Sequence, residues 1–173
     1  WFDKAAAGGD ETAAFNLGVL FDDGSLVPED NARAGAFYRL AADAGNVDAM
    51  INLGLMLESG EGVTRDLAAA ARYFKQAADR GDSYGKLKFG LMQQSGTGIV
   101  KNIEQAVNSL VAAFEMRDVD LEVILRDQPE QLSADARLAI KQVLAERDLI
   151  DGAENAEIDP ITLGAIEKHY AQK

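Results

Sequence analysis

Cysteine is absent from the 173-residue chain, which excludes disulfide bonds and thiolate metal ligands and leaves the redox compartment undecided. Proline occurs only three times, and helix-forming residues, above all alanine, dominate, so the composition predicts an all-α protein. No apolar run approaches the roughly 20 residues that a helix needs to cross a bilayer. Hydrophobic residues nevertheless make up 47% of the chain, which is enough for a packed core.

Basic residues are also scarce, with 17 Lys and Arg against 29 Asp and Glu and a net charge of −12. Such a surface repels phosphate backbones, and no basic stripe reverses that locally, so we expect no nucleic-acid partner. The negative net charge also disfavours binding to anionic membranes, and we expect no membrane insertion within this chain. A basic partner fits this charge.

The chain is organised by a repeat, because residues 13–24, 49–60 and 85–96 are related and whole columns recur 36 positions apart. The columns include Gly9, Gly45 and Gly81; Gly18, Gly54 and Gly90; Gly24, Gly60 and Gly96; Val27, Val63 and Ile99; and Ala34, Ala70 and Ala106. A fixed period of this length is typical of a solenoid, whose units bury their apolar faces against their neighbours. The chain starts inside a repeat, without methionine, so we expect it to be a piece of a longer protein.

Each unit is predicted to form two helices. The first follows an N-cap residue (Asp10, Asn46 or Asp82) and ends at Gly24, Gly60 or Gly96; the second follows Asp30, Asp66 or Asn102 and ends at Gly45 or Gly81. The branched loop residue, Val63 or Ile99, is expected to pack between helices. Because glycine inside a helix costs about 1 kcal/mol relative to alanine, the column of Gly54 predicts two helices crossing too closely for a side chain.

These columns resemble the Sel-one-like repeat, a relative of the tetratricopeptide repeat. The residues that carry the resemblance are Ala49, Leu53 and Gly54; Gly60, Gly62, Val63 and Asp66; and Ala70, Tyr73, Phe74, Ala77, Ala78, Gly81 and Asp82. The resemblance covers residues 1–116 and implies a right-handed α-α superhelix made of a partial first unit and three repeats. Leu26 replaces an expected loop glycine, and the third unit departs at Gly85, Phe89, Ser109 and Arg117, which indicates that the array is ending.

Residues 117–173 lack the period and are predicted to form a small helical C-terminal domain. We expect a linker helix at 120–126, a helix at 134–147, an acidic loop at 148–159 and a last helix that starts at Pro160. Ser133 is the expected N-cap of the second of these helices, whose buried face would hold Ala136, Ile140, Val143 and Leu144.

This tail resembles the small helical peptidoglycan-binding-like domain. The resemblance is carried by residues 138–144, 151–152, 158–160, 162 and 165–166. Asn155 and Ala156 stand where that family has Asp-Gly, and Asp159 stands where it has glycine. These turns shape the ligand surface of the family, so the resemblance implies the fold more firmly than it implies wall binding.

The sequence contains few candidates for catalytic residues. His169 is the single histidine and has no partner with which to form a catalytic set, so we interpret it as a solvent-facing residue. The acidic residues Asp151, Glu154, Glu157 and Asp159 lack the spacing of an EF-hand, which favours solvated loop charge over a calcium site. We therefore predict a non-enzymatic protein with no cofactor and no metal site.

Binding of a protein or peptide by a concave surface is the remaining prediction, since the first helices of a paired-helix solenoid line that surface. By analogy with tetratricopeptide packing, its residues are two apolar rows, Phe15, Ile51 and Leu87 and then Val19, Leu55 and Leu91, with Asn16, Asn52 and Lys88 beside them. An acidic rim of Asp22, Asp23, Asp48 and Glu58 favours an extended or helical peptide with basic residues. The alternative is that the apolar members are core residues between helices.

Three hypotheses of function stay open. In the first, the chain is a scaffold or regulatory module of a bacterial cell-envelope protein, because the order of repeats, linker and tail resembles the periplasmic ends of polar-organelle scaffold proteins. In the second, the tail binds peptidoglycan and the repeats are a spacer. In the third, the chain is the regulatory tail of a caspase-like enzyme located upstream of Trp1. The resemblance implies a periplasmic location, with a cytoplasmic one as the alternative.

Overall fold

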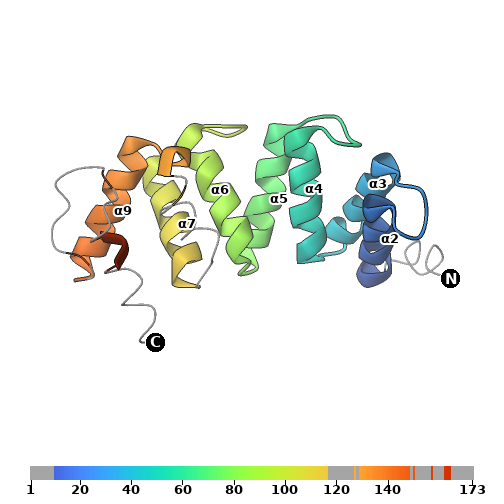
Figure 1. Ribbon diagram of the computed structural model, residues 1–173, viewed down its shortest axis with the longest axis horizontal. Coiled ribbons are helices and arrows are strands. Elements are labelled where there is room, and N and C mark those ends of the chain that lie inside the picture. Colours follow the sequence, from blue (N-terminus) through green and yellow to red (C-terminus); the bar gives the residue numbers. More distant parts are fainter. Residues whose placement is uncertain are drawn as a thin grey trace. The chain divides into compact units, whose positions relative to one another are not determined.

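A computed structural model describes residues 10–116, 127, 129–148, 150, 157 and 162–164 (Figure 1). These residues form helices and turns and contain no β-strand, which confirms the predicted all-α class. The chain divides into two compact units, Trp1–Gly85 and Lys86–Lys173, and each is described by itself. The boundary expected between residues 116 and 117 stays a prediction. None of the described helices is long and apolar enough to cross a membrane.

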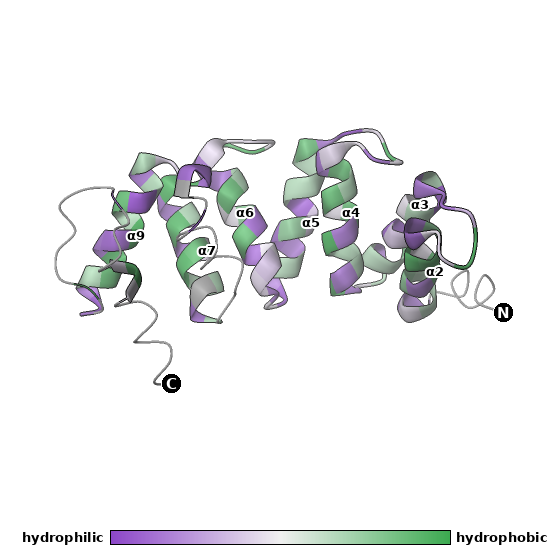
Figure 2. Cartoon of the chain, viewed as in Figure 1, coloured by the Kyte–Doolittle hydropathy of each residue, from purple (hydrophilic) through white to green (hydrophobic). Residues whose placement is uncertain are grey.

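The residues of the first unit that the structure describes include four helices of 13 residues each, α2 (Glu11–Asp23), α3 (Asn31–Asp43), α4 (Val47–Ser59) and α5 (Leu67–Asp79). Along the chain each helix packs against the next, and Figure 1 shows α4 and α5 side by side. The first turn of α6 (Ser83–Ser95) completes the unit. In Figure 2 hydrophobic and hydrophilic residues alternate along these helices, as expected for elements that bury one face.

The helix ends follow the predicted capping residues. Asp30 and Asp66 accept hydrogen bonds from the backbone N–H groups of Arg33 and Ala69 at 3.0 and 2.9 Å, and Asp10 and Asn46 cap α2 and α4 in the same way. Gly24 and Gly60 then end α2 and α4 in the left-handed conformation, with φ of 63° and 86°. Each such side-chain cap stabilises its helix by about 1 kcal/mol.

The mid-helix glycines face a large side chain of the next helix. A Cβ added to Gly18 would lie 2.5 Å from the Tyr38 ring, and one added to Gly54 would lie 2.7 Å from the Phe74 ring. The two rings are 1% and 0% exposed, so they fill the centre of their hairpins. The lack of room for a side chain at these glycines is confirmed, but its cause is an aromatic ring, Tyr38 or Phe74, that occupies the space above the glycine.

The loop between α4 and α5 packs on the preceding hairpin. Val63 contacts Gly35 on α3, where an added Cβ would lie 2.5 Å from the valine Cγ1, and Gly62 lies against the backbone of Asn31. The branched residue therefore packs between helices as predicted. Leu26, at the position equivalent to Gly62, is 84% exposed.

The second unit joins the rest of α6 to α7 (Ile103–Glu115), a short 3-10 helix (Pro129–Gln131) and α9 (Ala134–Glu146). The buried Gln94 holds the 3-10 helix and α9 in place. Its amide nitrogen donates to the Gln131 carbonyl at 2.5 Å, and its amide oxygen accepts from the Ser133 N–H at 2.8 Å. α9 also packs against α7.

The predicted helix after Ser133 is confirmed and ends at Glu146, one residue earlier than expected. The Ser133 hydroxyl accepts from the Ala136 N–H at 3.2 Å. Three of its expected core residues, Ala136, Ile140 and Leu144, are buried, and Val143 is half-buried. The predicted helix at 120–126, most of the acidic loop and His169 lie outside the described residues. Of the helix predicted from Pro160, only residues 162–164 are described, and they are helical.

The glycine contact generates a first prediction. Gly54→Ala raises helix propensity by about 1 kcal/mol but forces a methyl group into the Phe74 ring, and overpacking of this kind costs about 1–3 kcal/mol. We expect a net loss in the free energy of unfolding, measured by urea denaturation. In a Phe74→Ala background the ring is gone, so adding Gly54→Ala is expected to be neutral or stabilising. Equal losses in both backgrounds would show that the ring contact is not the reason for the glycine.

Candidate functional site

The predicted binding residues of the first unit lie on α2 and α4 and are only partly covered. Asn16 is exposed, and the other five, Phe15, Val19, Ile51, Asn52 and Leu55, are half-buried. The Phe15 ring packs on Tyr38, with a centroid distance of 5.9 Å. These side chains therefore contribute to the hairpin packing and still present surface to solvent.

A pocket of about 450 Å³ opens beside α4, between its second half and the end of α2. It brings together Asn52 and Leu55 from the predicted rows with Asp22 and Glu58 from the predicted acidic rim. Met56, Ser59 and the loop residue Glu61 complete its lining. Sequence reasoning missed these last three, because none of them belongs to the two predicted rows or to the predicted acidic rim.

Tyr38 connects the two sides of this pocket. Its hydroxyl donates a hydrogen bond to Asp22 Oδ2 at 2.9 Å, and the Asn52 side chain lies near the same hydroxyl. Burial, followed by the hydrogen bond and charge of Asp22, raises the pKa of Tyr38 well above its ordinary value. The hydroxyl is therefore a neutral donor that fixes Asp22 on α2 relative to α3.

The pocket is lined by both acidic and apolar residues. Asp22, Glu58 and Glu61 supply three carboxylates, and no basic side chain is among the seven lining residues. Leu55 and Met56 supply the apolar part. Within a chain of net charge −12, this arrangement attracts a cationic group that carries an apolar stem, such as the side chain of lysine or arginine.

The remaining predicted site residues, Leu87, Lys88 and Leu91, belong to the second unit. Lys88 and Leu91 are half-buried, whereas Leu87 is 2% exposed. For Leu87 the alternative interpretation applies, since a side chain buried to this degree is a core residue. The pocket beside α4 contains none of these three.

The described residues contain no cluster of His, Asp and Glu that would hold a metal ion. Their strongest polar arrangement is the Tyr38, Asp22 and Asn52 network, which lacks a nucleophile with an adjacent base. The site holds the carboxylate of Asp22 in a fixed position beside the apolar side chains that line the pocket.

Consecutive helical hairpins with a framework that recurs along the chain define a protein of the α-solenoid repeat class. A family model of the Sel1 repeat matches residues 1–10, 12–46, 47–82 and 85–108, which is more than half of the chain. The chain therefore belongs to the Sel1 repeat family. Proteins with these repeats typically mediate protein–protein interactions, and the repeat is generally a non-enzymatic interaction module.

Three solved structures support the same fold. A Sel1 repeat protein from Oxalobacter formigenes matches with a TM-score of 0.61 at 25% identity, over 73% of this chain and 52% of that chain. The protective antigen c5321 of uropathogenic Escherichia coli matches with a TM-score of 0.68 at 29% identity, over 85% of this chain and 32% of that chain. Cysteine rich protein B of Helicobacter pylori matches with a TM-score of 0.52 at 28% identity, over 69% of this chain and 91% of that chain.

The chain thus spans about half the length of the first of these relatives and about a third of the second. A comparison with curated proteins gives no significant match. The solenoid class expected from the sequence is confirmed by these matches, whereas the resemblance of the tail to a peptidoglycan-binding-like domain stays a prediction.

Tyr38→Phe tests the network at the pocket. Removing the hydroxyl leaves Asp22 without this hydrogen bond, and we expect a loss of about 1–2 kcal/mol in the free energy of unfolding at neutral pH. Because the pKa of Tyr38 is raised on folding, this contribution is complete below the ordinary tyrosine pKa of about 10 and is lost as the pH rises through the folded-state value. Urea denaturation of both proteins at increasing alkaline pH should show the difference shrinking; a constant difference would contradict the assignment.

Proposed function

We propose that the chain is a non-enzymatic docking module that binds a basic segment of a partner protein at the acidic pocket beside α4. The observation that carries this proposal is the convergence of Asp22, Glu58 and Glu61 around the half-buried Leu55. Carboxylates at the edge of an apolar surface suit a peptide in which a lysine or arginine lies next to an apolar residue.

The half-buried side chains of α2 and α4 would extend the contact beyond the pocket. Phe15, Val19 and Ile51 offer apolar surface, and Asn16 offers an exposed amide that can pair with the backbone of a bound peptide. Membership of a family that typically mediates protein–protein interactions supports this use of the face.

The setting proposed for this module is the bacterial cell envelope, with a periplasmic location, as the regulatory or scaffolding part of a longer protein. The partner segment would then belong to another envelope protein or, if a caspase-like domain lies upstream of Trp1, to that domain. Reading the full-length gene distinguishes these two cases. Fractionation of cells that carry the tagged full-length protein tests the location, and recovery in the cytoplasm alone would refute the periplasmic proposal.

Wall binding by the tail is the second candidate, and the helix that begins after Ser133 supports it because its capping and its buried face fit the expected small helical domain. Sedimentation with purified wall sacculi tests it directly. Retention of residues 1–173 that is lost on truncation after residue 116 would support the tail as the binding part. Absence of retention would remove this candidate and leave the docking proposal unaffected.

The docking proposal makes a specific prediction about peptide selection. Immobilised chain presented with a random peptide library should select peptides that carry lysine or arginine beside an apolar residue. The double variant Glu58→Gln/Glu61→Gln removes two of the three pocket carboxylates and should weaken binding of the selected peptides by about tenfold. Leu55→Glu should abolish binding, because it places a charge in the apolar part of the pocket.

The matched control is Glu104→Gln/Glu146→Gln, which removes the same charge from exposed positions on α7 and α9. This variant should bind the selected peptides as the wild type does. Selection without enrichment of basic residues, or equal weakening by the two double variants, would refute the pocket as the docking site. Circular dichroism establishes that each variant is folded.

A further inference from the structure

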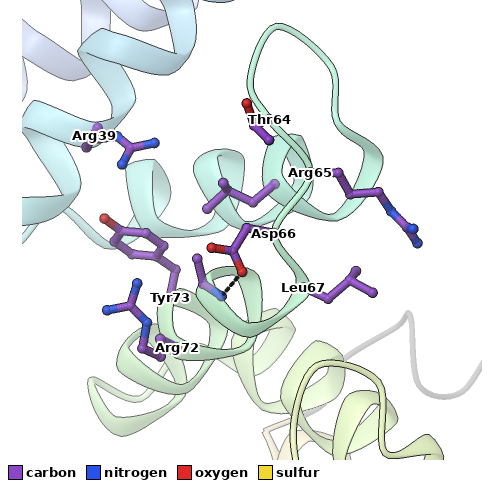
Figure 3. A pocket seen from close by; sticks show the side chains of 9 residues that line it. Arg39, Thr64, Arg65, Asp66, Leu67, Arg72 and Tyr73 are labelled. Atoms are coloured by element: carbon purple, nitrogen blue, oxygen red, sulfur yellow. Dashed lines mark hydrogen bonds between the residues drawn. The ribbon is translucent and has the colours of Figure 1, made fainter.

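A second pocket in the first unit has the opposite charge. It has a volume of about 690 Å³ and lies among α3, the end of α4, the loop after α4 and α5 (Figure 3). Three arginines and one aspartate line it, in a chain whose net charge is −12. The aspartate, Asp66, is the N-cap of α5 and accepts from the Ala69 N–H at 2.9 Å, so its carboxylate already has a structural role.

Two of the arginines are placed around Tyr73. Figure 3 shows Arg39 on one side of the Tyr73 ring and Arg72 on the other, while Arg65 points away from them. The positive charges of Arg39 and Arg72 act on the Tyr73 hydroxyl and favour its ionised form. Burial and the neighbouring Asp43 outweigh them, so the pKa of Tyr73 is raised.

Neither of these two arginines is used by the fold. Within the part of the chain that the structure describes, Arg39 and Arg72 form no hydrogen bond and no ion pair, and both are exposed. Arg65 differs, because its Nε donates to the Glu58 carbonyl at 2.9 Å. The fork of donors on each of the two guanidinium groups is therefore available to a ligand.

In the next hairpin the equivalent charged residues form an ion pair. Lys75 and Asp79 stand 36 residues after Arg39 and Asp43, and they form an ion pair of 2.7 Å along α5. On α3 the corresponding pair is not formed, since Asp43 instead accepts a hydrogen bond from the Tyr73 hydroxyl at 3.2 Å. Tyr73 thus takes the carboxylate that would otherwise neutralise Arg39 and leaves the guanidinium group directed to the pocket.

The repeat framework does not account for these residues. Position 36, one period before Arg72, is Ala36, and position 108, one period after it, is Asn108. Tyr73 occupies a position of the repeat pattern that is aromatic in the preceding repeat (Phe37) and serine in the following one (Ser109), so only its hydroxyl is particular to this repeat. Columns that serve packing, such as Ala34, Ala70 and Ala106, are preserved, whereas Arg72 and the Tyr73 hydroxyl occur in one hairpin alone among these repeats.

We propose that this pocket binds a small organic oxyanion, a phosphate or carboxylate group attached to an apolar body. Arg39 and Arg72 would supply the guanidinium groups that bind the oxyanion, since planar guanidinium groups bind such groups through paired charge-assisted hydrogen bonds. The Tyr73 ring and the nearly buried Leu57 and Ala69 would contact the apolar body. The volume lies in the range of about 300–1,000 Å³ that is typical of small-molecule sites.

Phenyl phosphate, benzoate and inorganic phosphate are the probes for this proposal. In a titration at constant ionic strength, followed by two-dimensional NMR, the backbone amides around Arg39, Arg72 and Tyr73 should shift. Phenyl phosphate should bind more tightly than inorganic phosphate, because only the former fills the apolar part. Equal affinity for the two phosphates would identify the ligand as a free oxyanion instead of an organic one.

Arg39→Gln and Arg72→Gln should each weaken binding of phenyl phosphate by about tenfold, with no change in thermal stability because neither side chain supports the fold. Lys75→Gln is the matched control, since it removes the same charge from the repeat-equivalent position and should leave the affinity unchanged. No shift of these amides with any probe, or equal weakening by Arg39→Gln and Lys75→Gln, would overturn the proposal. The docking pocket beside α4 is unaffected by either result.

Discussion

The contact between a mid-helix glycine and a large side chain of the following helix is the constraint on which each described hairpin depends. Gly18 lies under Tyr38, Gly54 under Phe74 and Gly90 under Leu110. The glycine costs its helix about 1 kcal/mol, whereas full burial of a large apolar side chain stabilises by about 1.5–3 kcal/mol. The exchange is favourable in these three hairpins, and it fixes the register of the first two because Gly18 and Gly54 are the only positions on α2 and α4 that lack a side chain.

This constraint also explains where the acidic pocket arises. The framework position above the glycine holds Phe74 in one hairpin and Tyr38 in the other. The Phe74 side chain has no polar group, whereas the Tyr38 hydroxyl donates a hydrogen bond to Asp22 and lies near Asn52. A single oxygen added at a packing position therefore converts the edge of a hairpin into an organised polar surface.

The roles of residues that act within their own helix were predictable from the sequence, and the contacts between side chains of different helices were not. Caps such as Asp66 and left-handed glycines such as Gly60 act on their own helix, so their role can be inferred from spacing alone. The Tyr38 network and the Arg39 pocket join residues of different helices, and no column of the repeat records such a pairing. The degree of burial could not be predicted from the repeat columns either, because Ile51 is half-buried whereas Leu87, one period later, is 2% exposed.

The two pockets of the first unit use the charge of the chain in opposite ways. A net charge of −12 raises the local concentration of cations near Glu58 and Glu61, so the long-range field assists the acidic pocket. The same field opposes any anion that approaches Arg39 and Arg72. Binding there must come from short-range contacts, in which paired donors at a partly desolvated site outweigh a repulsion that salt screens beyond about 10 Å. The repeat framework thus determines where surfaces form, and the few side chains outside the period determine which charge each surface accepts.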